Sequence, residues 1–122
     1  MMKKTELGAW GEDRAAEYLT ENGFRIICRN FRCRMGEIDL IAEKEGILVF
    51  AEVKLRKNSL YGEAREFVTA EKQRKLRLAA SFYLAGSSRA QNLQPRFDVL
   101  EVYAPQGTTG LVTINHLENA FE

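Results

Sequence analysis

The sequence has little of what several classes of protein require. Its 122 residues include only two cysteines, two prolines and one histidine, and no apolar run approaches the roughly 18 to 20 residues of a membrane-spanning helix. A signal-peptide core is also absent, because the N-terminal residues lead straight into a polar helix pattern. We therefore expect a cytoplasmic protein with no membrane partner. Since 45% of the residues are hydrophobic, disorder, collagen and coiled coil are excluded, and one globular domain over residues 1–122 is expected.

The cysteines and the histidine do not form a pattern typical of a reactive or zinc-binding site. Cys28 and Cys33 lie five residues apart in a strand-like segment, where alternation would point them to opposite faces. His116 has no Cys or His at ligand spacing, and no Gly-x-Ser-x-Gly motif is present for it to serve. We therefore expect no disulfide, and we interpret His116 as a structural or surface residue.

Charge is nearly balanced but unevenly distributed. The 18 basic and 17 acidic residues leave a net charge of +1. Four arginines nevertheless fall within ten residues that contain no acid, namely Arg25, Arg29, Arg32 and Arg34. Such a cluster suits a phosphate backbone, and a solvated strand edge explains it equally well.

The hydrophobic periodicity predicts a single α/β domain with the element order αβββαββ. Helices are expected at 8–22 and 70–85, and strands at 24–32, 36–44, 47–56, about 95–103 and 111–117. Gly23 and Gly86 end the two helices, and Thr69 caps the second one. Glu45-Gly46 is typical of a two-residue hairpin turn.

The register of that hairpin predicts two opposed carboxylates. One face pairs Ile38 with Val53, Leu40 with Ala51 and Ala42 with Val49, and the other pairs Ile41 with Phe50, Asp39 with Glu52 and Glu37 with Lys54. Like charges directly across a ladder are destabilising unless a cation lies between them. A divalent ion would resolve the conflict between Asp39 and Glu52.

Two more polar residues fall on faces that should be apolar. Glu12 lies at the centre of a stripe of small apolar residues in the first helix. A carboxylate there is costly unless it binds a metal or pairs with an arginine, and both alternatives are open. Gln73 lies on the inward stripe of the second helix, where it could cap a strand end or orient a water or a phosphate.

These residues belong to a larger set of motifs that covers nearly the whole chain. The motifs are Gly11-Glu12, Arg29-Asn30-Phe31-Arg32, Gly36-Glu37-Ile38-Asp39-Leu40-Ile41-Ala42, Phe50-Ala51-Glu52-Val53-Lys54, Lys72-Gln73-Arg74-Lys75-Leu76, Arg96-Phe97-Asp98-Val99 and Glu118-Asn119-Ala120-Phe121. Together they resemble the PD-(D/E)xK nuclease-like superfamily and, within it, the bacterial YraN family, which is similar to archaeal Holliday junction resolvases. Ile38 stands where the superfamily pattern has proline. The resemblance implies a restriction-endonuclease-like core, with a mixed central sheet flanked by helices.

The resemblance also implies a metal site. Asp39, Glu52 and the Val53 carbonyl would bind Mg²⁺, with Mn²⁺ as a substitute, and Glu12 would complete the site directly or through water. Carboxylate and carbonyl oxygens are the hard ligands that Mg²⁺ prefers.

Further roles follow from the same resemblance. Lys54 would handle the nucleophile, and Gln73 would orient the attacking water or a phosphate oxygen. The basic residues expected to hold the nucleic-acid backbone without reading bases are Arg29, Arg32, Arg34, Lys57 and Lys72.

The leading hypothesis is a Mg²⁺-dependent endonuclease that hydrolyses phosphodiester bonds in DNA. Recognition of branched or junction DNA is expected, because nothing resembles a separate sequence-reading domain, and a homodimer would supply two active sites. The alternative is a catalytically inactive nucleic-acid-binding or adaptor module on the same fold. A third interpretation is a structural ion-pair network of the opposed carboxylates with Lys54 and no metal.

Overall fold

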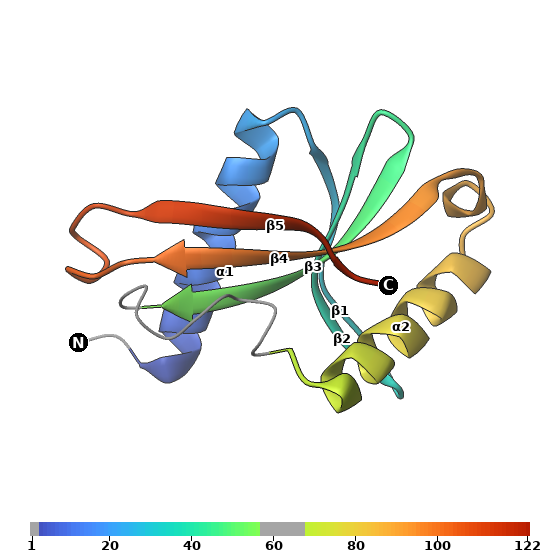
Figure 1. Ribbon diagram of the computed structural model, residues 1–122, viewed down its shortest axis with the longest axis horizontal. Coiled ribbons are helices and arrows are strands. Elements are labelled where there is room, and N and C mark those ends of the chain that lie inside the picture. The colour runs from blue at the N-terminus through green and yellow to red at the C-terminus, as the bar shows by residue number, and fades with distance from the viewer. Residues whose placement is uncertain (1–2, 57–67) are drawn as a thin grey trace.

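The computed structural model describes residues 3–56 and 68–122. Within them, a five-stranded mixed sheet carries one long helix against each face (Figure 1). Its elements are α1 (Lys4–Glu21), β1 (Arg25–Cys33), β2 (Gly36–Lys44), β3 (Ile47–Arg56), α2 (Ala70–Ala85), the 3₁₀ helix η2 (Ala90–Asn92), β4 (Gln94–Tyr103) and β5 (Thr113–Phe121). The predicted order αβββαββ is therefore confirmed. Neither helix in the described ranges combines the length and apolarity needed to cross a membrane.

The strands follow one another across the sheet in the order β1-β2-β3-β4-β5. Neighbouring strands are antiparallel except β3 and β4, which are parallel. Parallel neighbours need a crossover connection, and α2 lies within the segment that makes it (Figure 1). β3 is the central strand of the sheet, and β3 and its parallel neighbour β4 are the most buried strands.

Two apolar clusters fill the space between the sheet and its helices. Alternation along β3 sends Leu48 and Phe50 toward α2, and Val49 and Ala51 toward α1. The α1 side is closed by Leu19, which is fully buried. The helix faces predicted from the 3.6-residue periodicity are confirmed by the buried Ala15, Ala16 and Leu19 of α1 and Leu76 and Ala80 of α2, whereas Gly8, also predicted on the α1 stripe, is exposed.

The local signals at the helix ends are confirmed. Gly23 adopts φ +89° after α1, and the Phe24 amide donates to the Leu19 carbonyl at 2.9 Å, as in a Schellman cap. At the start of α2, Thr69 accepts a hydrogen bond from the Lys72 amide at 3.1 Å. The predicted bounds differ most for α1, which already begins at Lys4, and for β5, which runs over 113–121 instead of 111–117.

The prediction that the cysteines point to opposite faces is wrong. Cys28 and Cys33 both pack against the cluster on the α2 side. The reason is Asn30, which adopts φ 54° between them and so interrupts the two-residue alternation of β1. Both cysteines are free thiols.

The hairpin register is confirmed near the turn and lost further away. Glu45 and Gly46 have φ values of 49° and 81°, as in a type I′ turn, and the ladder includes Ala42–Val49 and Leu40–Ala51 but no pair beyond them. The predicted pair Ile38–Val53 is therefore wrong: Ile38 packs on the α2 side, whereas Val53 packs on the α1 side.

One buried carboxylate joins β4, β5 and α1. Asp98 accepts hydrogen bonds from the Arg96 guanidinium and from the Asn119 amide at 3.0 Å, and it lies 2.6 Å from Nε2 of His116. The other ring nitrogen of His116 lies 3.1 Å from the Tyr18 hydroxyl. This agrees with the structural interpretation of His116.

Replacing Asp98 should therefore be costly. We expect Asp98→Ala to lower the free energy of unfolding by about 3 to 5 kcal/mol, because it leaves buried donors without their acceptor. Asp13→Ala, which removes a pair with Arg29 whose side chains are 40% and 48% exposed, should cost less than about 1 kcal/mol. Urea unfolding of both variants measures the difference, and equal losses would contradict this account.

Candidate active site

The candidate site lies where β2 and β3 separate. The ladder between these strands ends at Leu40 and Ala51. One residue further along β2, Oδ2 of Asp39 accepts a hydrogen bond from the Val53 amide at 2.8 Å. Beyond the last ladder pair, the Val53 amide of β3 thus donates to the Asp39 side chain instead of to the backbone of β2. The two strands separate at this point.

Asp39 is surrounded by negative charge. Burial raises its pKa, and repulsion from Glu52 raises it further, while the hydrogen bond from Val53 lowers it. Glu12 and Glu37 add smaller repulsions, and the pKa reaches about 7. The charged form of Asp39 is therefore destabilised, and binding a proton or another cation would stabilise the carboxylate.

Glu52 is the most buried acid of the site. Its residue is 6% exposed, and its Oε1 atom lies 3.6 Å from the ammonium nitrogens of both Lys54 and Lys72. Lys54 follows Glu52 on β3, whereas Lys72 comes from the first turn of α2. Two lysines from different elements thus share one carboxylate.

Glu12 reaches the site from the opposite helix. The α1 turn that carries it lies against β3, since a Cβ added at Gly11 would lie 3.9 Å from the Leu55 side chain. Glu12 is half-buried and acts on Asp39 through its charge. In the part of the chain that the structure describes, it has no ion pair with an arginine, so the arginine alternative is not found there.

The acids of the site fit a magnesium ion that keeps much of its coordination shell for water and substrate. In residues 3–56 and 68–122, no group of three or more acids, histidines or cysteines is close enough to hold a metal by itself. Mg²⁺ is usually bound by one or two carboxylates, with water and substrate phosphates completing its shell. Asp39 and Glu52 supply such a pair of carboxylates.

Gln73 stabilises the start of α2. Its side-chain amide donates to the Val68 carbonyl at 2.9 Å, and its backbone amide donates to the Thr69 carbonyl at 2.8 Å. Gln73 therefore caps the segment that enters α2, and not the strand end that the sequence analysis offered. The side-chain oxygen has no hydrogen bond within the described residues.

The expected backbone-binding residues do not form one group. Arg29 pairs with Asp13 at 2.6 Å and Arg32 pairs with Glu37 at 3.6 Å. Arg34 is exposed, and Lys72 belongs to the site itself. Lys57 lies outside the described residues.

A second buried acid next to the site was missed by the sequence analysis. Glu101 is 1% exposed and lies beside Lys54 in the parallel register of β4 and β3. It accepts hydrogen bonds from the Tyr103 hydroxyl and the Asn115 amide, each at 3.0 Å, and from Arg56 at 3.4 Å. Alternation along β4 already placed it on the same face as Glu52, and this was the available signal.

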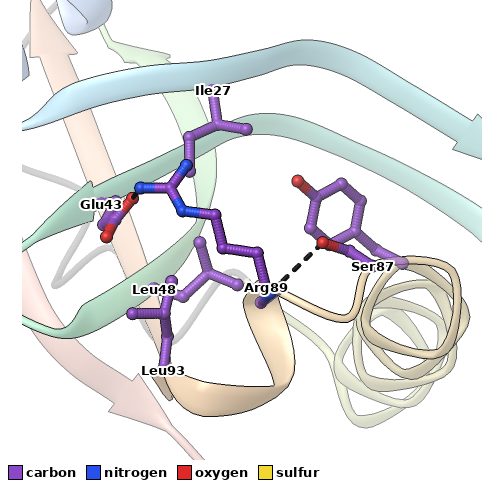
Figure 2. Close-up of a pocket in the computed structure, with 8 residues that line it drawn as sticks. Ile27, Glu43, Leu48, Ser87, Arg89 and Leu93 are labelled. Atoms are coloured by element: carbon purple, nitrogen blue, oxygen red, sulfur yellow. Dashed lines mark hydrogen bonds and ion pairs between the residues drawn. The ribbon is translucent and has the colours of Figure 1, made fainter.

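The small pocket in Figure 2 is not part of this site. It lies between β1, β2 and the η2 segment, with Glu43 and Arg89 paired at 2.9 Å on its rim. Its cavity volume is about 30 Å³, the space of a single water molecule. None of the candidate site residues lines it.

The charge of Asp39 should make the metal-free protein less stable as pH rises. Its folded pKa of about 7 lies above the usual value of 3.8, so stability is lost as pH rises from about 3.8 to about 7. Asp39→Asn cannot ionise, and in EDTA at pH 8 we expect it to be roughly 1 to 4 kcal/mol more stable than the wild type. At pH 4 the advantage should disappear.

Urea unfolding at both pH values tests this expectation. The matched control is Asp13→Asn, which loses an exposed ion pair and should be slightly less stable at pH 8. An Asp39→Asn protein less stable than the wild type at pH 8 would show that the bond to Val53 outweighs the repulsion.

The site residues fall in a segment shared with other proteins. The model of the uncharacterised protein family UPF0102 matches residues 11–102. A UPF0102 protein of Symbiobacterium thermophilum is 50% identical over 117 residues, which cover 94% of this chain and 95% of that protein. Another, of Rhodococcus opacus, is 47% identical over 121 residues, covering 99% of this chain and 100% of that protein. The chain therefore belongs to the uncharacterised protein family UPF0102, the YraN-like family that its motifs resemble.

Proposed function

We propose that this protein is a Mg²⁺-dependent endonuclease that hydrolyses phosphodiester bonds in DNA. One observation carries the proposal: Asp39 and Glu52 repel each other where β2 and β3 separate, with Lys54 beside them. A carboxylate with a perturbed pKa close to a lysine and a second carboxylate is typical of catalytic sites. A structural network would be expected to pair every acid, and the shift of Asp39 shows that its charge is not compensated.

The order and topology of the elements support a PD-(D/E)xK core. The first acid of that pattern lies on β2, and the acid-x-Lys motif lies on the central strand β3, which pairs in parallel with β4. The preceding helix supplies Glu12 from the other side of the sheet. We take this arrangement as support for membership of that superfamily.

The residues of the site have separable roles in this proposal. Asp39, Glu52 and the Val53 carbonyl would hold Mg²⁺, and Glu12 would add negative charge beside them. When bound, Mg²⁺ lowers the pKa of a water molecule and offsets the charge that develops at phosphorus. Lys54 has three donors and would hold and orient the attacking oxygen.

Binding of the nucleic-acid backbone is proposed for the basic residues around the site. Lys72 and Arg34 have exposed side chains on the α2 side and at the β1–β2 turn. Arg29 and Arg32 would first have to leave Asp13 and Glu37, so we expect them to contribute less. Lys57 keeps its proposed role on the basis of the sequence resemblance.

Recognition of branched DNA is a further part of the proposal. Cutting a four-way junction symmetrically needs two active sites, and a small chain supplies them by forming a homodimer. Phosphate contacts position such an enzyme without reading bases, and we propose that Arg34 and Lys72 make such contacts.

A nucleic-acid-binding module without catalysis is the second candidate. It is favoured by Glu52, whose charge two lysines already neutralise at 3.6 Å without a metal. Such a module would bind DNA equally well in EDTA and in Mg²⁺.

Cleavage of labelled DNA tests the proposal. Single-stranded, duplex, flap and four-way-junction DNA, with RNA counterparts, would be incubated in Mg²⁺ or Mn²⁺. We expect the wild type to cut, and Asp39→Asn and Lys54→Met to lose at least about a hundredfold in rate. Glu17→Gln, which changes an exposed acid of α1 paired with Arg14, should cut like the wild type when purified identically.

The outcomes separate the candidates. Equal cutting by the wild type and Asp39→Asn would indicate a contaminating nuclease and contradict the proposal. Binding of DNA by the wild type without any cutting would favour the second candidate, and preferred cutting of the junction would support the resolvase-like role.

A further inference from the structure

Lys72 breaks a local rule of helix formation. Thr69 caps α2 through the Lys72 amide, so Lys72 occupies the third helical position. In a capping box this position holds Glu or Gln, which reaches back to the cap residue. A positive charge there is also unfavourable, because the helix dipole is positive at its N-terminus. Residues that contradict local rules in this way are often found at functional sites.

Glu52 compensates for this unfavourable position. Its carboxylate lies 3.6 Å from the Lys72 ammonium group, the same distance as from Lys54. The side chain of Lys72 is 42% exposed, compared with 27% for Lys54. Lys72 is therefore the lysine that can leave Glu52 for a ligand in solution, while Lys54 stays on the same strand.

We propose that Lys72 is a positioning residue that holds Glu52 while no metal is bound and turns to a nucleic-acid phosphate when a divalent cation takes the carboxylate. This inference rests on the proposed function. It assigns the two lysines different roles: Lys54 stays with the reacting oxygen, and Lys72 couples metal binding to substrate binding. The coupling is reciprocal, since each ligand then favours the other.

Electrostatics gives the expected size of the effect. A unit charge about 6 Å from a divalent ion weakens its binding roughly tenfold even at the dielectric constant of water. Removing the charge of Lys72 should therefore tighten Mn²⁺ binding to the DNA-free protein by about tenfold. A lysine on α2 that does not contact Glu52 would change this affinity much less.

The first experiment measures Mn²⁺ binding by calorimetry in the wild type, Lys72→Gln, Lys75→Gln and Asp39→Asn. Glutamine at position 72 completes the capping box, so Lys72→Gln is expected to keep its fold, which circular dichroism checks. Lys75→Gln is the matched control, because Lys75 is an exposed lysine one turn further along α2. We expect about tenfold tighter binding in Lys72→Gln, no change in Lys75→Gln and a large loss in Asp39→Asn.

The second experiment measures the salt dependence of binding to a phosphorothioate duplex, which keeps the backbone charge and resists hydrolysis. In EDTA, Lys72 stays on Glu52, so the wild type and Lys72→Gln should show the same slope. In Mg²⁺, the slope of log binding constant against log salt concentration should be steeper for the wild type than for Lys72→Gln by about 0.9, the value for one additional phosphate contact. Lys75→Gln should show the same difference between EDTA and Mg²⁺ as the wild type.

The results distinguish this inference from the proposed function. Mn²⁺ binding that requires Asp39 but is unchanged or weakened in Lys72→Gln overturns the role of Lys72 and leaves the metal site standing. Absence of any Asp39-dependent Mn²⁺ binding overturns both. Equal slopes of the wild type and Lys72→Gln in Mg²⁺ overturn the proposed transfer of Lys72 to phosphate.

Discussion

The hydrogen bond from the Val53 amide to the Asp39 carboxylate is the interaction on which the candidate site depends. A backbone donor on a strand must find an acceptor, and here a side chain provides it just after the β2–β3 ladder ends. Asp39 is thereby held beside Glu52, although the two carboxylates repel each other. The separation of the strands also lets Ile38 turn toward α2, which fills the core on that side.

The acids of the central strands differ in how their charges are satisfied. Asp98 and Glu101 are buried acids, each held by three different residues, and such fully paired groups make a rigid support. Asp39 instead lies among other acids, and burial and repulsion from Glu52 raise its pKa to about 7. In the proposed function, a divalent cation would offset this repulsion.

Much of this arrangement could be predicted from local patterns. The caps at Thr69 and Gly23, the turn at Glu45-Gly46 and the pair Leu40–Ala51 each depend on a few neighbouring residues, so the sequence was sufficient to place them. The pair Ile38–Val53 and the faces of the cysteines were predicted wrongly. Regular alternation was assumed there, whereas a side-chain acceptor and the positive φ of Asn30 interrupt it.

The sequence by itself determined the element order, the two helix faces and the acids that disagree with their apolar surroundings, because these follow from periodicity within single elements. Only the tertiary structure decided which charges meet. Glu12 comes from α1, Asp39 from β2 and Lys72 from α2, and their interactions depend on how two helices pack on opposite faces of one sheet. Coulombic energies vary with distance and burial, and neither quantity is written in the spacing of residues along the chain.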